Sequence, residues 1–233
     1  MRVSITTWFL ISAVTVMSSY AALAVPISQA APQGIQALVA ETQRTSGDPN
    51  RVHLVWWVPV DLWPVAMGAN PNVSKQQIDQ LVRVMSPYTL IAVADGEVGP
   101  LGGVNWMSEG ALRSRLAIVD SKGEEYTPLS PEQVGADARN LAAVLKPLLT
   151  NVVGAVGENL HFFYFPAQTR TGAAIAEAGA EGAFAVKSVD IVHRWRLPLG
   201  SLLPPTQCPV DGERMNGGWK FCPWHGKELV TSR

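Results

Sequence analysis

The chain has 233 residues, of which 47% are hydrophobic and 16% are charged, and its formal net charge is -1. A near-neutral chain with no run of like charges gives no electrostatic basis for binding nucleic acid or an anionic membrane surface. The apolar content is enough for a sizeable core in one domain, with a small tail appended to it.

The N-terminal segment is predicted to be an export signal. Arg2 is the last charged residue before Glu41, and the stretch from residue 8 to 25 is largely apolar. Small-residue cleavage motifs end at Ala24 and Ala30, so the signal peptide is expected over residues 1–24, or up to residue 30. Left uncleaved, the same run is long enough to anchor the chain in a bilayer. Cleavage would make the protein periplasmic or secreted.

Residues 25–50 are predicted to be a flexible spacer because they are rich in Ala, Gln, Ser and Thr. Residues 51–205 form the predicted domain. Its strands are expected at 52–60, 88–94, 116–120, 124–129, 160–165, 182–189 and 191–197, and its helices at 74–85 and from 130 to about 150. The pattern predicts an α+β fold, in which two or three helices pack on a mainly antiparallel sheet or sandwich-like body.

Two local expectations accompany this assignment. Asp95-Gly96 is expected to close its strand, with a Gly-rich loop following to residue 103. Ser130-Pro131 is expected to start the longest helix, and Pro147 to kink it or end it early. Within that helix Leu141, Val144 and Leu145 are expected to face the core, and Leu148 and Leu149 as well if the helix survives Pro147.

The segment 117–126 carries a Val-Asp-x-x-Gly-x-x-Tyr pattern and is similar to a hairpin common in exported bacterial β-sandwich modules. The central region as a whole resembles uncharacterised bacterial secreted proteins. This resemblance implies export and points to no particular activity.

Catalytic patterns in the central region are weak. The loop 95–103 lacks the Gly-Lys-Ser/Thr ending of a phosphate cradle, and no HExxH or DxDxDG pattern occurs. His53, His161 and His193 each lie in apolar, strand-like sequence, where a histidine is more often a core or edge residue than a general base.

The strongest chemical signal is a motif that occurs twice near the C-terminus. Cys208-Pro-Val-Asp-Gly212 returns as Cys222-Pro-Trp-His-Gly226, offset by 14 residues, and both cysteines of the chain lie in these copies. A thiolate followed three residues later by a second donor, in a turn shaped by Pro and Gly, is typical of a loop that binds a tetrahedral metal ion.

Residues 208–229 resemble a zinc ribbon, in which two C-P-x-C-G knuckles hold one structural zinc ion. The resemblance implies that Cys208 and Cys222 are ligands, with Asp211 and His225 in the places of the family's second cysteines. Carboxylate and imidazole are legitimate zinc ligands. Two alternatives remain open: a Cys208–Cys222 disulfide, favoured by an oxidising compartment, and a hairpin with neither metal nor disulfide.

Tryptophans cluster at 56, 57 and 63 and again at 195, 219 and 224. Exposed aromatic side chains bind sugars or proteins with little loss of entropy. We therefore expect a non-catalytic exported protein of the cell envelope, an interaction module for an envelope protein or a glycan, whose tail at 206–233 is closed by a metal or a disulfide. The alternative is an envelope hydrolase that uses one of the strand histidines.

Overall fold

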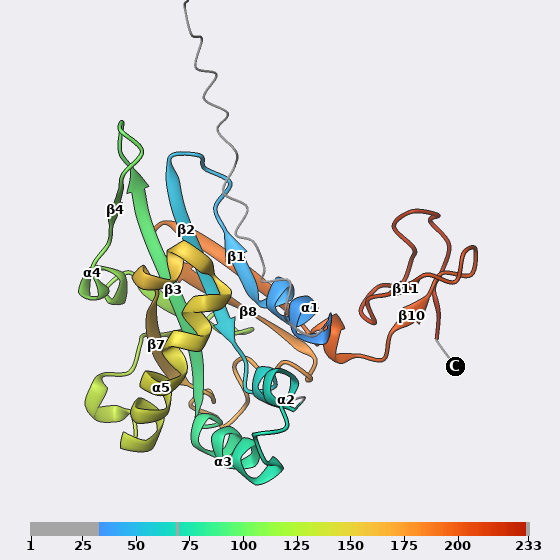
Figure 1. Ribbon diagram of the computed structural model, residues 1–233, viewed down its shortest axis with the longest axis horizontal. Helices are drawn as coiled ribbons and strands as arrows, with labels where there is room; N and C mark the ends of the chain where they lie inside the picture. The colour runs from blue at the N-terminus through green and yellow to red at the C-terminus, as the bar shows by residue number, and fades with distance from the viewer. Residues whose placement is uncertain (1–32, 69, 232–233) are drawn as a thin grey trace, which may run out of the picture.

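The computed structural model describes residues 33–68 and 70–231 (Figure 1). The predicted signal peptide lies outside these residues. Within them the chain forms 12 β-strands, all in antiparallel sheets, and five α-helices. The α+β prediction is confirmed, with more helices than the two or three expected. None of the helices in the described part is long and apolar enough to cross a bilayer.

The first sheet forms the middle layer of the body. Its strands are β1 (Gln43–Thr45), β2 (Arg51–Val58), β3 (Tyr88–Val98), β4 (Val104–Trp106) and β7 (His161–Pro166). The order is β1-β2-β3, and β7 and β4 pair with successive parts of β3 on its other edge. Most residues of β2 and β3 are buried, because both faces of this sheet are covered.

The second sheet covers one face of the first. It has the order β6-β5-β8-β9, with strands β5 (Leu116–Val119), β6 (Glu125–Tyr126), β8 (Gly182–Ser188) and β9 (Ile191–Leu197). Buried and less buried residues alternate along β8 and β9, as expected for a sheet with one face toward solvent. Trp57 on β2 packs edge-on against Phe184 and Trp195, which joins the two sheets.

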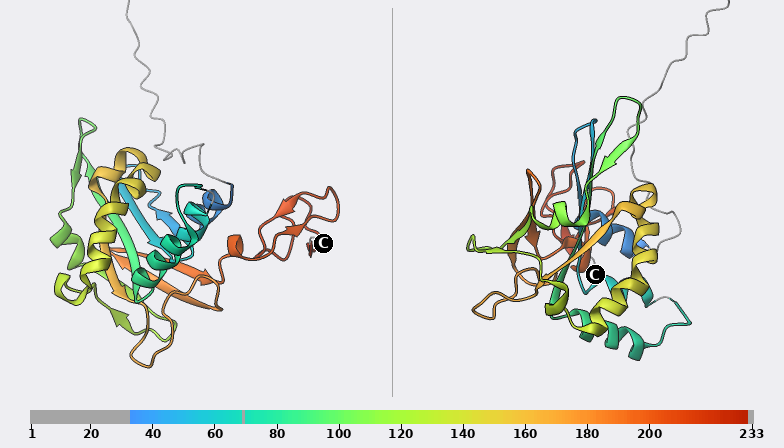
Figure 2. Two further views of the ribbon diagram at one scale, coloured as in Figure 1. Left: turned by 60° about the horizontal axis from the view of Figure 1, so that its bottom comes forward. Right: turned by 90° about the vertical axis from the view of Figure 1, so that its left-hand side faces the viewer.

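Helices cover the opposite face of the first sheet (Figures 1 and 2). They are α1 (Gln33–Thr42), α2 (Leu62–Met67), α3 (Lys75–Met85) and α5 (Ala136–Val152), while the short α4 (Glu109–Arg113) follows β4. Trp56, beside Trp57 on β2, points toward this layer, and its Nε1 donates to Thr42 Oγ1 at the end of α1. The two adjacent tryptophans therefore point to opposite faces of the sheet, and both are buried.

Helix α3 begins where the sequence predicted. The Ser74 side chain accepts from the N–H of Gln77, and the Gln77 side chain accepts from the N–H of Ser74, which completes a capping box. The long helix differs from its prediction. Ser130-Pro131 starts only a short 3-10 helix, Pro131–Gln133, and α5 begins at Ala136 and continues through Pro147.

Other expectations were wrong for identifiable reasons. The Asp95-Gly96 pair does not end its strand, because β3 continues to Val98 while pairing with both β2 and β4. Val144 is 69% exposed, so it does not belong to the buried stripe of α5. Residues 33–45, inside the predicted spacer, form α1 and β1, since Leu38 and Val39 supply a buried face that the polar composition obscured.

The tail extends away from the sandwich after a short 3-10 helix, Gly200–Leu202 (Figures 1 and 2). It contains a third sheet of two-residue strands in the order β11-β10-β12, namely β10 (Thr206–Gln207), β11 (Arg214–Met215) and β12 (Val230–Thr231). The tail has a small core of its own, made of Cys208, Met215 and Cys222, with Leu229 packed beside it.

Candidate metal centre

The repeated motif in the sequence is also a repeat in the structure. In the first knuckle the N–H of Gly212 donates to Cys208 O at 2.9 Å, and the N–H of Cys208 donates to Glu213 O at 2.9 Å. In the second knuckle Gly226 donates to Cys222 O and Cys222 donates to Lys227 O, both at 2.8 Å. The same ring of backbone hydrogen bonds is thus built twice.

The cross-strand pairing repeats with the same offset of 14 residues. Gln207 pairs with Arg214 across the first knuckle, and Phe221 pairs with Glu228 across the second. Gly212 and Gly226 end the two turns with φ of +74° and +61°, a conformation that favours glycine. The spacing of Cys, Pro and Gly therefore fixes two matching turns that bring Cys208 and Cys222 together.

Three donor atoms converge between the knuckles. The Sγ atoms of Cys208 and Cys222 and the Nδ1 atom of His225 all lie within 4.8 Å of one another. Nδ1 is 3.3 Å from the Cys208 sulfur and 3.5 Å from the Cys222 sulfur. Sulfur and nitrogen ligands at the corners of a zinc tetrahedron lie about 3.5 Å apart, given ordinary Zn–S and Zn–N bond lengths. The donors therefore fit a tetrahedral ion.

The position of Asp211 differs from that of the other three predicted ligands. Its Oδ2 atom lies 3.6 Å from His225 Nδ1, but the carboxylate is not part of the convergent group. Its Oδ1 accepts from the N–H of Glu213 at 3.0 Å. That backbone hydrogen bond, together with the Cys208 thiol, lowers the pKa of Asp211 and keeps the carboxylate charged beside the group.

The two thiols have different environments although both are free and buried. Burial raises the pKa of Cys208. Burial acts in the same direction on Cys222, but the N–H groups of His225 and Trp224 and the His225 ring outweigh it and lower the pKa of that thiol. Cys222 is consequently the sulfur that ionises more readily, and a thiolate is the form that binds metal.

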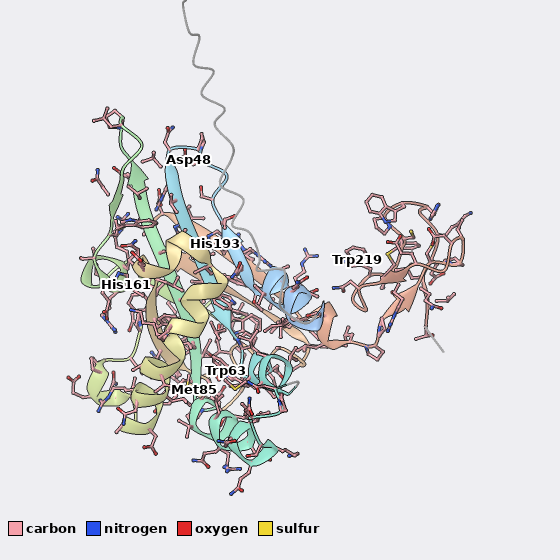
Figure 3. The ribbon with its side chains drawn as sticks, in the orientation of Figure 1. Asp48, Trp63, Met85, His161, His193 and Trp219 are labelled. Atoms are coloured by element: carbon pink, nitrogen blue, oxygen red, sulfur yellow. The ribbon has the colours of Figure 1, made fainter. Side chains whose placement is uncertain are left out.

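Several apolar side chains of the tail are exposed. Val210 and Trp224 occupy the same position in the two knuckles, and they are 57% and 73% exposed. Trp219 and Phe221, in the segment that leads into the second knuckle, are 48% and 59% exposed. Figure 3 shows Trp219 on the tail, away from the sandwich. The predicted aromatic surface therefore lies on the tail, because the other predicted members, Trp56, Trp57, Trp63 and Trp195, are buried.

The strand histidines form a second cluster that sequence reasoning missed. His53 on β2 and Asp95 on β3 are cross-strand neighbours, and His53 Nδ1 lies 2.6 Å from Asp95 Oδ2. On the other sheet, His193 of β9 places its Nε2 atom 3.1 Å from His53 Nε2. The alternation of β2 and β3 could have suggested the first contact. The second joins two sheets and has no signal in the sequence.

His161 does not join this cluster (Figure 3). It lies on β7, half-buried, with its Nδ1 atom 4.0 Å from a carboxylate oxygen of Glu109. Burial lowers the pKa of His161, with an opposing effect from that carboxylate.

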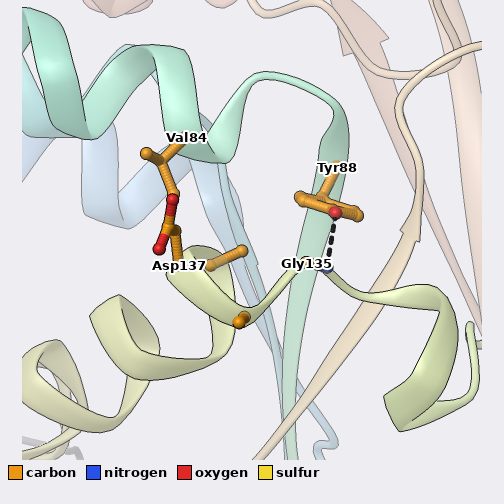
Figure 4. Close-up of a pocket in the computed structure, with 6 residues that line it drawn as sticks. Val84, Tyr88, Gly135 and Asp137 are labelled. Carbon is orange, nitrogen blue, oxygen red and sulfur yellow. Dashed lines mark hydrogen bonds between the residues drawn. The ribbon is translucent and has the colours of Figure 1, made fainter.

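A pocket of about 280 Å³ lies where α3 ends and α5 begins, apart from both clusters (Figure 4). Its polar side chains are Tyr88 and Asp137, and the Tyr88 hydroxyl accepts from the N–H of Gly135 at 2.9 Å. None of the predicted site residues lines it. Comparison with protein-family models, with curated proteins and with solved structures finds no match for this chain.

Proposed function

We propose that this chain is a non-catalytic exported protein of the cell envelope whose C-terminal tail is an interaction module held together by one structural zinc ion. The observation that carries the proposal is the arrangement of the two knuckles, which bury Cys208 and Cys222 and leave Val210 and Trp224 exposed at equivalent positions. A soluble protein rarely keeps such side chains together in solvent unless they meet a partner.

Cys208, Cys222 and His225 supply three of the four ligands in this proposal. Asp211 supplies the fourth in this proposal, because its Oδ2 atom lies 3.6 Å from His225 Nδ1 and is the nearest carboxylate oxygen given for that ring. Four protein ligands leave no position for substrate, so the ion stabilises the fold of the tail. It would replace the large core that a segment of this size lacks.

The proposed partner is an envelope protein with an apolar surface. Sugars stack on flat aromatic faces, whereas an aliphatic side chain such as Val210 offers them no such face. A protein surface can cover aliphatic and aromatic side chains alike, including Val210, Trp224 and the exposed Phe221 of the tail. A glycan partner is an outcome of the test below.

The metal is tested on protein purified from its native compartment, by measuring zinc content and free thiols together. We expect one zinc per chain and two thiols that react after chelation and denaturation. Protein without zinc, whose thiols react only after reduction, would instead establish a Cys208–Cys222 disulfide. Protein with neither zinc nor disulfide would contradict both forms of the clip.

The partner is tested by placing a photo-crosslinking residue at position 224 in producing cells, with position 192 on β9 as the matched control. Val192 is also exposed, but it lies on the sandwich. We expect a crosslinked protein from position 224 only, lost when His225→Ala removes a metal ligand. Equal crosslinking from both positions would contradict the proposal. Binding of the wild-type protein to purified cell-wall polysaccharide, lost in Trp224→Ser, would identify a glycan instead.

Export is tested by N-terminal sequencing of the mature protein. The predicted cleavage sites place the first residue of the mature protein at position 25 or 31. A mature chain that retains Met1 would contradict cleavage and would indicate that the N-terminal segment is an uncleaved membrane anchor.

One observation supports the alternative of an envelope hydrolase. Asp95 binds the Nδ1 atom of His53, as a carboxylate does when it orients a catalytic histidine. A general base must reach the proton that it abstracts. The side chains of His53 and Asp95 are 0% and 2% exposed, and they do not line the pocket between α3 and α5. Binding therefore remains the proposed function, and the histidines are given a different role below.

A further inference from the structure

The two buried histidines form a head-to-head hydrogen bond between the sheets. Their Nε2 atoms are 3.1 Å apart, and their rings are inclined by only 21° with centres 5.2 Å apart. The distance between the ring centres is about what is expected when the two Nε2 atoms lie on the line that joins the centres, since each nitrogen then lies between its own ring centre and the other ring. The rings therefore meet edge to edge rather than face to face, and a single proton lies between the two nitrogens.

The hydrogen-bonding partners of Asp95 fix the positions of the protons on the two histidines. Asp95 accepts two hydrogen bonds from Arg51, at 3.0 and 2.6 Å, so it is a carboxylate and His53 Nδ1 must donate to it. A neutral His53 then has an acceptor at Nε2, and the N–H of His193 Nε2 donates to it. Both imidazoles are neutral, with one donor each used in the chain.

The surroundings oppose a further proton on this pair. Arg51 on β2 and Arg44 on β1 are cations nearby, and Arg44 also stacks over Trp195, the neighbour of His193 on its strand. Asp95 is already shared between Arg51 and His53. Asp190, in the turn between β8 and β9, is bound to Arg51 at 2.6 Å and lies 62% exposed. No buried carboxylate among these neighbours is left to accompany an added positive charge.

We propose that the His53–His193 pair is an acid-sensitive latch that holds the β8–β9 hairpin against the first sheet while both rings are neutral and weakens when the pair takes up a proton. Of the other contacts between the sheets, the packing of Trp57 on Phe184 is apolar and does not titrate, and the Arg51–Asp190 ion pair joins β2 to the turn of the hairpin. Acid therefore acts locally, on the part of the hairpin next to its turn.

The direction of the pH dependence follows from the two states of His193. Burial, then His53 and Arg44, lower its pKa in the folded protein to about 4 from an ordinary value of 6.5. Burial likewise lowers the pKa of His53, against the effect of Asp95. The stabilising contribution of the neutral pair is complete above pH 6.5 and is lost as pH falls toward 4. The pKa of Asp190 is lowered by Arg51, so this carboxyl stays charged across that window.

The test compares thermal unfolding of the full chain with that of His193→Gln between pH 6.5 and about 4. Glutamine keeps an N–H donor for His53 but takes up no proton in this range. We expect the wild-type Tm to fall by about 4 °C more than that of His193→Gln over the window. His161→Gln, a strand histidine outside the pair, should retain the wild-type pH dependence. Equal pH dependence of wild type and His193→Gln would overturn the latch.

A second measurement applies even if His193→Gln fails to fold. Imidazole resonances of the wild-type protein report the titration of each histidine directly. We expect the His193 ring to titrate near pH 4, with the protection factors of the β9 amides, corrected for the intrinsic pH dependence of exchange, falling over the same range. A His193 ring that titrates at pH 6.5 or above, or protection factors in β9 that do not change with its titration, would overturn the proposal.

Discussion

The side-chain amide of Asn216 donates a hydrogen bond of 2.5 Å to the carboxylate of Glu41, and this contact joins the tail to the first helix of the body. The other carboxylate oxygen of Glu41 accepts from the N–H and the hydroxyl of Ser201, at 2.9 and 2.6 Å. One glutamate from the predicted spacer thus fixes both the 3-10 helix before the tail and the tail itself.

Glu41→Ala should loosen this joint. The change leaves the partly buried donors of Ser201 and Asn216 without their acceptor, and we expect the free energy of unfolding to fall by about 1–3 kcal/mol. Urea unfolding measures this loss, and limited proteolysis should cut faster between residues 202 and 206. Glu181→Ala, at an exposed position, should change the stability by less than about 0.5 kcal/mol. Proteolysis at the wild-type rate would show that the glutamate does not hold the tail.

Gly200→Ala should break the same joint from the other side. A Cβ at Gly200 would lie 1.7 Å from Asn216 Oδ1, so the Asn216 side chain must leave its place and lose its bond to Glu41. We expect destabilisation of about 1–2 kcal/mol by urea unfolding. Gly182→Ala, where no atom lies within 4 Å of the added Cβ, is the matched control. In the background of Asn216→Ala, Gly200→Ala should have a much smaller effect, because the colliding side chain is absent.

Substitutions in the tail should distinguish residues that bind zinc from residues that do not. His225→Ala removes a convergent donor, and we expect a loss of zinc affinity of about 100-fold or more, measured by competition with a chelator. Asp211→Asn keeps an oxygen donor without its charge and should weaken binding by about 10-fold or more. His161→Ala should leave the affinity unchanged. If His225→Ala bound zinc as tightly as the wild type, the histidine would not be a ligand.

The contact between the two sheets should tolerate truncation poorly. Phe184 is buried between Trp57 and Trp195, with ring centres 4.8 and 5.1 Å away. Phe184→Ala should lower the free energy of unfolding by about 3–5 kcal/mol because it leaves a cavity there. Val144→Ala, on the exposed face of α5, should change it by less than about 0.5 kcal/mol. A small effect at Phe184 would contradict the packing of the two sheets.

Local chemistry made several elements predictable from the sequence. Alternating apolar residues gave β8 and β9, because one face of their sheet meets solvent. Ser74 predicted the start of α3, because the capping contacts that it makes with Gln77 span only three residues. The prediction that Asp95-Gly96 ends its strand was wrong because turn propensity is a local property. The pairing of β3 with β2 and β4 involves residues that are distant in the sequence.

In the tail, the sequence by itself determined the two turns and three convergent donors, because each knuckle closes through hydrogen bonds within six residues. Tertiary structure decided how far Asp211 stands from that group and which tryptophans reach solvent. It also placed His53 against His193, across 140 residues of chain. Contacts between sheets depend on how whole layers pack, and no short-range pattern records that packing.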